Sequence, residues 1–168
     1  MAAEANLKKP VPDISPNIPA TCCQIDRKSM NKISIRPYAE SDFDAVDALW
    51  GEVFPEDPPW NRASAAIPKK MAFQPDLFFV ALQGGRVIGT AMAGYDGHRG
   101  WLYSLAVRGN AQGTGLGAML VRHVEQALKA VGCVKLNLQV RSSNSNVISF
   151  YERLGYAVED RVSLGRNL

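Results

Sequence analysis

Three apolar runs separated by two short turns restrict the fold of this chain more than any other feature of its sequence. The runs cover residues 77–82, 87–95 and 101–107, and each has the length and apolar content of a buried β-strand. Gly84-Gly85 can adopt the positive backbone angles that a tight hairpin turn requires, and residues 96–100 form the second turn. We therefore expect three consecutive antiparallel strands.

Shorter elements precede these runs. Residues 33–37 alternate between apolar and polar side chains, as in a strand. Apolar side chains then recur at helical spacing: Phe43, Val46, Leu49, Trp50 and Val53. Pro55 breaks this helix, and we expect a shorter helical stretch over residues 62–71, interrupted or kinked near Pro68.

The second half of the sequence predicts a crossover instead of a hairpin. One face of an amphipathic helix is formed by Leu116, Met119, Leu120, Val124, Ala127, Leu128 and Val131. Gly132 is placed to cap this helix, and residues 134–140 alternate as in another strand. Capping candidates at residues 142–144 begin a short helix that ends at Gly155, and a last strand follows over residues 156–164.

Antiparallel strands followed by one strand-helix-strand crossover indicate an α+β domain with a mixed α/β sheet. The chain has 168 residues, of which 46% are hydrophobic, enough for one domain with a full core. Residues 1–29 contain four prolines and no apolar period, so we expect a disordered extension there and a single domain over residues 30–168.

Composition argues against several classes of partner. A formal net charge of +3 is too small to indicate nucleic-acid binding. No stretch approaches the ~20 apolar residues that cross a bilayer, and no secretory signal is visible, so we expect a cytoplasmic protein without membrane contact. The spacing of Cys22, Cys23 and Cys133 suits neither a disulfide framework nor a metal site, and Cys133 is expected to be a small buried hydrophobe.

A glycine-rich segment, Gln112-Gly113-Thr114-Gly115-Leu116-Gly117, separates a strand from the amphipathic helix. Backbone N–H groups at a helix start bind anions, and glycine leaves room for a phosphate to approach. The segment is not a nucleotide P-loop, because no Gly-Lys-Ser/Thr follows it, and its glycine spacing departs from the dinucleotide fingerprint. A diphosphate ligand of another kind fits better.

Asn144 and, seven residues later, Tyr151 within Phe150-Tyr151-Glu152-Arg153-Leu154-Gly155-Tyr156 add a second motif. The sequence here resembles the GNAT superfamily of N-acetyltransferases, whose acetyl-CoA loop has the form Gln/Arg-x-x-Gly-x-Gly/Ala and whose later motif is Asn, spacer, Tyr-x-x-x-Gly-Phe/Tyr. The resemblance covers residues 33–164. Pro59-Trp60-Asn61 and residues 94–100 look like the small YpeA-like bacterial acetyltransferases.

The resemblance implies a mostly antiparallel sheet of six to seven strands with about four helices, splayed between strands four and five. It implies that the pantetheine arm of acetyl-CoA lies along strand four, that Asn144 contacts the cofactor and that no metal takes part. The strand-four contacts would be Leu105, Ala106 and Val107. The pyrophosphate would lie on the main chain of Gln112, Gly113, Thr114, Gly115, Leu116, Gly117 and Ala118.

The implied reaction is direct attack of a neutral amine on the thioester in a ternary complex. A lysine-type amine, with a pKa of about 10.4, must first lose a proton. A strand-four N–H near Leu105 would stabilise the oxyanion. With a thiol pKa near 8.5 and a phenol pKa near 10, proton donation from Tyr151 to the leaving thiolate is uphill by only about 2 kcal/mol. Tyr151 is therefore our candidate general acid, in contact with the cofactor; the alternative is a packing residue.

The general base and the amine acceptor stay open at this stage. Better-understood relatives place a glutamate at about the position of Trp101. Glu52, Asp96 or His98 could act through water instead; the alternative is that each is a solvated turn or helix-end residue. The acceptor side would be formed by Glu52, Glu56, Asp57 and Trp60, and acidic charge beside an aromatic ring suits a cationic amine. Small amines, peptide N-termini and protein lysines all remain candidates.

Two other functions are compatible with parts of the sequence. A domain that binds acyl-CoA as a sensor or scaffold, without turnover, is favoured by the missing carboxylate on strand four. A nucleotide-binding phosphotransferase would need a lysine and a magnesium ligand near the loop, which the sequence does not supply. The expected last strand could lie at a sheet edge and pair with a second copy in a homodimer.

Overall fold

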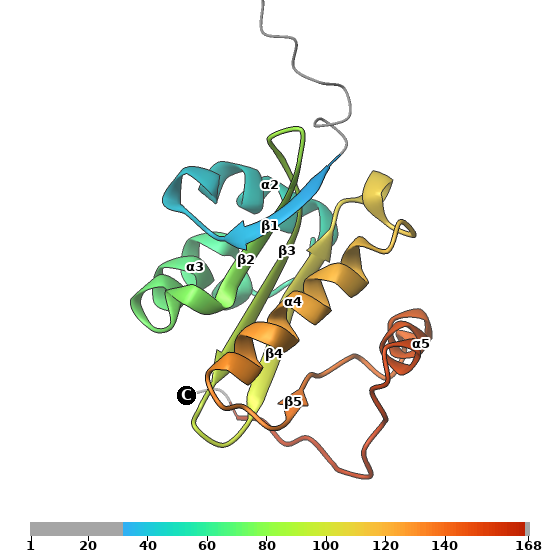
Figure 1. Ribbon diagram of the computed structural model, residues 1–168. Coiled ribbons are helices and arrows are strands. Elements are labelled where there is room, and N and C mark those ends of the chain that lie inside the picture. Colours follow the sequence, from blue (N-terminus) through green and yellow to red (C-terminus); the bar gives the residue numbers. More distant parts are fainter. Residues whose placement is uncertain (1–31, 167–168) are drawn as a thin grey trace, which may run out of the picture.

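A five-stranded sheet runs through the computed structural model of the protein, which describes residues 32–166 (Figure 1). Its strands follow in chain order: β1 (Ile33–Pro37), β2 (Phe78–Gln83), β3 (Arg86–Tyr95), β4 (Gly100–Val107) and β5 (Leu136–Asn137). The first four are antiparallel, and β5 pairs with β4 in parallel. The expected meander is confirmed, including the turn in which Gly84 and Gly85 have φ of 57° and 78°. The N-terminal extension, with Cys22 and Cys23, lies outside the described residues.

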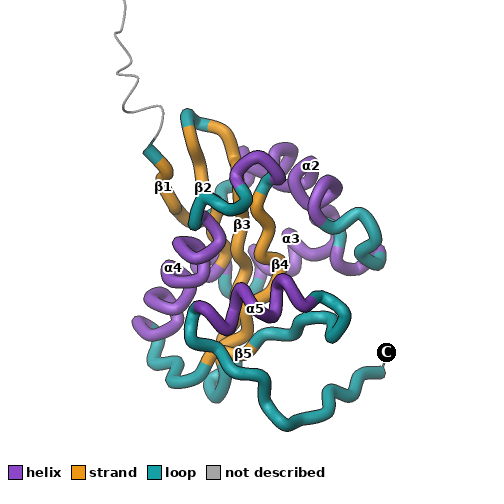
Figure 2. The backbone as a smooth tube through the Cα atoms, turned by 90° about the vertical axis from the view of Figure 1, so that its right-hand side faces the viewer, coloured by secondary structure: helices purple, strands orange, loops and turns teal. Residues whose placement is uncertain are grey.

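Helices cover both faces of the sheet (Figure 2). They are α2 (Phe43–Val53), α3 (Ala63–Ala72), α4 (Leu116–Ala130) and α5 (Ser145–Arg153). The expected helical stretch is confirmed as α3, which continues through Pro68, so of the two expected effects of this proline an interruption does not occur. The Ser64 carbonyl, four residues earlier, is the one that Pro68 leaves without a helical partner, and both residues are exposed, so water can hydrate it. None of the helices within residues 32–166 is long and apolar enough to cross a membrane.

Two hydrophobic clusters hold the layers together, one on each face of the sheet. The first includes Leu116, Leu120, Val124 and Leu128 of α4, and the second includes Val46, Leu49 and Trp50 of α2. The strand β2 contributes to both, since Phe79 and Ala81 belong to the first cluster and Phe78 and Val80 to the second. Alternate side chains of a strand point to opposite faces, so a sheet covered on both faces needs such a continuous apolar run.

A β-bulge interrupts β4 at Ser104. Thr90 of β3 pairs with Ala106 and Met92 pairs with Tyr103, so Ser104 and Leu105 together face a single residue of β3. Ser104 has φ of 50°, a conformation that is uncommon for a residue other than glycine. The extra residue exchanges the two faces of the strand. Leu102 therefore packs in the cluster under α4, whereas Ala106 packs in the cluster under α2.

A buried chain of hydrogen bonds fixes this bulge. The Trp50 indole Nε1 donates to Thr90 Oγ1 over 2.9 Å, and Thr90 Oγ1 donates to the Ser104 carbonyl over 3.2 Å. In a trans peptide the carbonyl of residue 104 and the N–H of residue 105 point in opposite directions, and no cis peptide bond is present in the described residues. Because the Ser104 carbonyl accepts from the Thr90 side chain, the Leu105 N–H of the same peptide points away from that side chain.

The strand β5 leaves β4 almost at once. Only Gly100 with Leu136 and Trp101 with Asn137 are paired, and the two segments then separate. The splay between strands four and five is thus confirmed, but the expected strand over residues 134–140 is reduced to two residues because its later part has no ladder partner.

The expected last strand over residues 156–164 is wrong. No strand forms there, and Val158, Val162 and Leu164 are 76%, 86% and 91% exposed. A two-residue β5 offers too short an edge for a further strand to pair with, so the sheet has five strands within residues 32–166 instead of six to seven. Pairing with a second copy through that strand loses its structural basis.

Gly100 tests how tightly the junction of β4 and β5 is packed. A Cβ there would lie 2.8 Å from Cys133 Sγ and 3.0 Å from Leu128 Cδ1, so Gly100→Ala should destabilise the fold by about 1–3 kcal/mol. Gly51→Ala is the matched control: nothing lies within 4 Å of its Cβ on α2, and alanine should stabilise that helix by about 0.5–1 kcal/mol. Urea unfolding measures both, and equal midpoints would contradict the prediction.

Thr90→Val tests the buried hydrogen-bond chain. The isosteric change leaves the Trp50 N–H without its acceptor and the Ser104 carbonyl without this donor, and should lower the free energy of unfolding by about 1–3 kcal/mol. Thr114→Val is the control, because Thr114 donates to the Ala111 carbonyl from an exposed loop where water can replace it. If both variants unfold at the same urea concentration, the chain does not stabilise the bulge.

Candidate functional site

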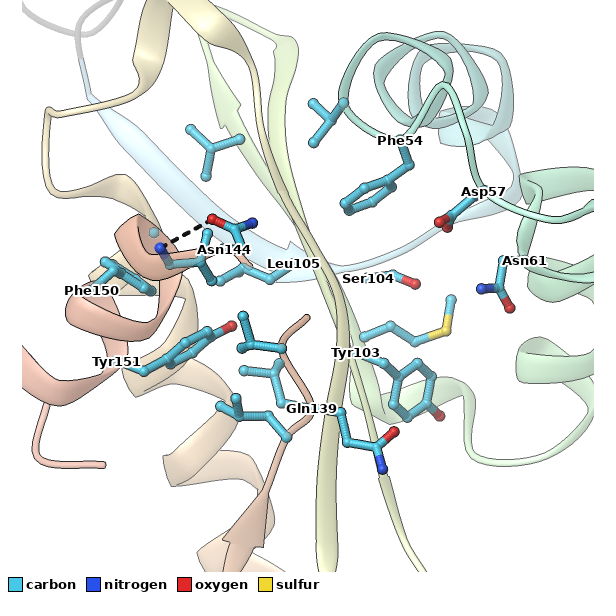
Figure 3. A pocket seen from close by; sticks show the side chains of 18 of the residues that line it. Phe54, Asp57, Asn61, Tyr103, Ser104, Leu105, Gln139, Asn144, Phe150 and Tyr151 are labelled. Atoms are coloured by element: carbon cyan, nitrogen blue, oxygen red, sulfur yellow. Dashed lines mark hydrogen bonds between the residues drawn. The ribbon is translucent and has the colours of Figure 1, made fainter. Parts of the chain in front are cut away.

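A cleft of about 1440 Å³ opens where β5 has left β4. One wall is formed by the loop before α4, by residues 138–141 and by α5, and the other by the connection from α2 to α3 together with α3. The bulged part of β4 lies between the two walls: the side chains of Tyr103 and Ser104 point toward Asp57 and Asn61, and that of Leu105 toward Asn144 and Tyr151 (Figure 3). The cleft is therefore divided by β4 into a loop side and an α3 side.

The loop side presents backbone N–H groups without partners. The amides of residues 113–118 make no hydrogen bond within the described part of the chain, because α4 begins only at Leu116. Gly113 and Gly115 have φ of 75° and 89°, which favours glycine at both positions. The loop is held by Gln112 Nε2, which donates to the Val107 carbonyl over 3.0 Å. Consecutive free amides at a helix start suit an anion such as a phosphate.

Gly117 shows how closely the two helices approach across this loop. A Cβ on Gly117 would lie 3.2 Å from Cζ of Phe150, so α5 is packed against the start of α4. A larger residue at this position would push Phe150 away and fill the space beside the free amides.

Nine of the residues expected to bind the cofactor line the cleft: Leu105, Val107, Gln112, Gly113, Gly115, Gly117, Ala118, Asn144 and Tyr151. Three do not. Ala106 is buried in the cluster under α2, Leu116 is buried under α4, and the Thr114 hydroxyl is bonded to the Ala111 carbonyl. Any contact of these three residues with a ligand would have to come from the main chain.

Asn144 caps α5, as the sequence predicts. Its Oδ1 accepts a hydrogen bond from the Val147 N–H at 3.4 Å, drawn as a dashed line in Figure 3. The amide nitrogen of the same side chain makes no hydrogen bond within residues 32–166, so it can donate to a ligand in the cleft.

Tyr151 lies on α5 with its ring buried and only 8% exposed. The ring packs edge-on against Phe150 and Tyr156, with centroids 5.0 Å and 5.5 Å away. Its hydroxyl is directed toward β4 (Figure 3). Burial raises the pKa of Tyr151 to about 12, so the phenol is protonated at neutral pH.

The three candidate bases lie outside this cleft. Glu52 pairs with Arg108 at 2.9 Å and accepts from the Gly109 N–H, so it ties the end of α2 to the end of β4. Asp96 Oδ1 accepts from the backbone N–H groups of His98 and Arg99 in the turn, and these bonds lower the pKa of Asp96. Both carboxylates therefore have structural partners.

The α3 side contains some residues that the sequence points to and others that it does not. Glu56, Asp57 and Trp60 line the cleft as expected. Sequence reasoning missed Phe54, Asn61, Lys70, Met92 and Tyr103, which also line it. The apolar members follow the period of ordinary core residues, so no sequence signal separates them from the core. Lys70 stands out only in the structure, which places it on the inward face of α3 with Ala63 and Ile67, where a lysine is unusual.

Comparisons with known proteins agree with this architecture. The acetyltransferase (GNAT) family model matches residues 43–156. Acetyltransferases of Yersinia enterocolitica and Pectobacterium atrosepticum are each 41% identical over 136 residues, which cover 81% of this chain and 96% of each relative. The aminoglycoside N-acetyltransferase AAC(6')-Iy, solved with CoA, has a TM-score of 0.67 at 20% identity over 81% of this chain and 95% of its own. The chain thus belongs to the GNAT family of acetyltransferases.

Proposed function

We propose that this acetyltransferase moves the acetyl group of acetyl-CoA to a primary amine by direct attack in a ternary complex. The cofactor would occupy the loop side of the cleft, and the amine would enter from the α3 side. Acetyl-CoA supplies the activated carbonyl, and the chain binds, orients and exchanges protons with the reactants.

The row of free amides at residues 113–118 is the observation that carries this proposal. Six adjacent donors at the positive end of α4 form a cradle for linked phosphates, and the gap left by β5 extends from that cradle along β4. Leu105 and Val107 line this gap, where an extended amide-containing arm can hydrogen-bond with the strand edge. The residues present therefore fit acetyl-CoA.

The Leu105 N–H would stabilise the oxyanion that develops on the carbonyl. The buried bonds from Trp50 through Thr90 to the Ser104 carbonyl orient this peptide before any ligand arrives. A donor held in place in advance does not have to reorganise during the reaction, which is why such donors contribute strongly to catalysis.

Tyr151 would assist the departure of the thiolate. With a pKa of about 12, full transfer of its proton to a thiolate of pKa near 8.5 is uphill on the order of 5 kcal/mol. Because Tyr151 is buried, complete proton transfer to the thiolate costs more free energy than an ordinary phenol pKa near 10 predicts. A hydrogen bond from the protonated phenol to the developing thiolate is the role that this pKa favours.

A thermal-shift titration tests the cofactor proposal. Acetyl-CoA at about 100 times its dissociation constant should stabilise the protein by about 2.7 kcal/mol and raise the melting temperature by several degrees, whereas NAD and ATP should have little effect at the same concentration. Gly117→Val should remove most of the shift, because its side chain fills the space beside the amides. Equal shifts with all three ligands would contradict the assignment.

Tyr151→Phe should lower kcat about 10- to 100-fold and leave acetyl-CoA affinity nearly unchanged, because only a hydroxyl that acts on the leaving group is removed. Tyr38→Phe is the matched control: the Tyr38 hydroxyl is buried without a partner and does not line the cleft, so its loss should not slow turnover. An unchanged rate in Tyr151→Phe removes Tyr151 from the mechanism. Tight acetyl-CoA binding without acetylation of any amine would favour the sensor function instead.

A further inference from the structure

Lys70 is a buried cation without a counter-charge. The residue is only 5% exposed, yet it lines the α3 side of the cleft. Its ammonium donates one hydrogen bond, to the Ala93 carbonyl on β3, and lies 6.0 Å from the centre of the Tyr103 ring. No carboxylate within residues 32–166 forms an ion pair with it.

The two other residues that are classed as buried and polar, Asp42 and Thr90, are satisfied, and the one buried side-chain oxygen without a partner in residues 32–166 is the uncharged Tyr38 hydroxyl, outside the cleft. Asp42 forms a two-pronged pair with Arg36, at 2.7 Å and 2.8 Å, and also accepts from the Ala39 N–H. Thr90 both accepts and donates a hydrogen bond. An ammonium has three donors, so Lys70 keeps two of them unused. Lys70 is therefore the exception among the three buried polar residues in residues 32–166.

An uncompensated buried ammonium is unfavourable because it has lost its hydration without gaining an anion. The same desolvation lowers the pKa of Lys70 to about 8. A ligand with an anionic group at this position would replace the lost hydration of the Lys70 ammonium by a charge-assisted hydrogen bond in a partly dry cleft. Two free donors match the two oxygens of a carboxylate.

Lys70 lies a short distance from the reacting end of the cleft. Its partner Ala93 pairs with Leu102, three residues before Leu105 on β4. At ~3.3 Å per residue along the strands and ~4.8 Å between β3 and β4, the Ala93 carbonyl that Lys70 contacts and the Leu105 N–H are roughly 8–11 Å apart. After one hydrogen bond of ~3 Å at each end, a few ångströms remain, which a small molecule bridges.

We propose that Lys70 binds the carboxylate of the amine acceptor, so that the substrate class is a small aminocarboxylate such as an ω-amino acid or short peptide. This inference rests on the proposed acetyl transfer to an amine. The carboxylate pairs with Lys70 while the amine reaches the carbonyl beside Leu105. Asp57, half-buried in the cleft, provides negative charge for the amino group.

This arrangement disfavours a polyamine as the acceptor. Glu56 is 86% exposed and lies 4.0 Å from Arg141, so its charge is hydrated and shared. Lys70 is buried, and a second ammonium placed beside it would be repelled with little screening by solvent. The charge of the buried Lys70 thus influences substrate selectivity more than the charge of the exposed Glu56.

A panel of matched substrates tests this proposal. Glycine, β-alanine, 4-aminobutanoate, 5-aminopentanoate and 6-aminohexanoate are each compared with the corresponding carboxamide. At least one acid should be acetylated with a kcat/KM about 10- to 100-fold above that of its amide, with most of the difference in KM. Lys70→Met should abolish this preference, so that each acid and its amide have similar kcat/KM, whereas Lys70→Arg should restore part of it. Lys129→Met, an exposed lysine at the end of α4, is the control and should behave as wild type.

The outcomes separate this proposal from the proposed function. Acetylation of amides and acids at equal rates, or an acid preference that survives in Lys70→Met, overturns the carboxylate site while acetyl transfer stands. If no amine is acetylated, the proposed function fails, and melting temperatures of the CoA-saturated protein then decide on Lys70. Stabilisation by 6-aminohexanoate or a shorter homologue, absent with the amides and absent in Lys70→Met, supports the site. No stabilisation by any of the acids overturns it.

Discussion

The candidate site depends on the bulge at Ser104, which the buried hydrogen bonds from Trp50 through Thr90 hold in place. One extra residue in β4 exchanges the two faces of the strand, so Leu102 and Ala106 pack under different helices. The same hydrogen bonds turn the Leu105 N–H away from the Thr90 side chain, on a strand segment that β5 has already left. A regular β4 would place Leu102 and Ala106 on the same face of the sheet.

Several unused donors of the described residues gather around the cleft. The amides of residues 113–118, the amide nitrogen of Asn144 and two donors of Lys70 all lack partners within residues 32–166, and all belong to the segments that line the cleft. A row of donors without protein partners beside a cavity, next to a helix start, suits a ligand rich in acceptors. In the proposed ternary complex, the phosphates of the cofactor would accept from the donors on the loop side. The carboxylate of the amine substrate would accept from Lys70 on the α3 side.

Local patterns in the sequence predicted much of the fold. The meander, the helices α2 and α4, the cap at Asn144 and the glycine loop each depend on neighbouring residues, and each is confirmed. The features that were missed depend on distant partners. Residues 134–140 and 156–164 alternate as strands do, but an alternating segment forms a ladder only where a neighbouring strand stays alongside. The positive φ of Ser104 follows from Trp50 and Thr90, and no pattern around Ser104 announces it. Lys70 is recognisable only once α3 is seen to turn it inward.

The direct test of the account is a crystal structure of the protein with acetyl-CoA. We expect the two linked phosphates to accept hydrogen bonds from the amides of residues 113–118, the pantetheine arm to run along β4, and the thioester oxygen to lie within hydrogen-bonding distance of the Leu105 N–H. A cofactor bound elsewhere, or phosphates held only by side chains while those amides stay free, would contradict it.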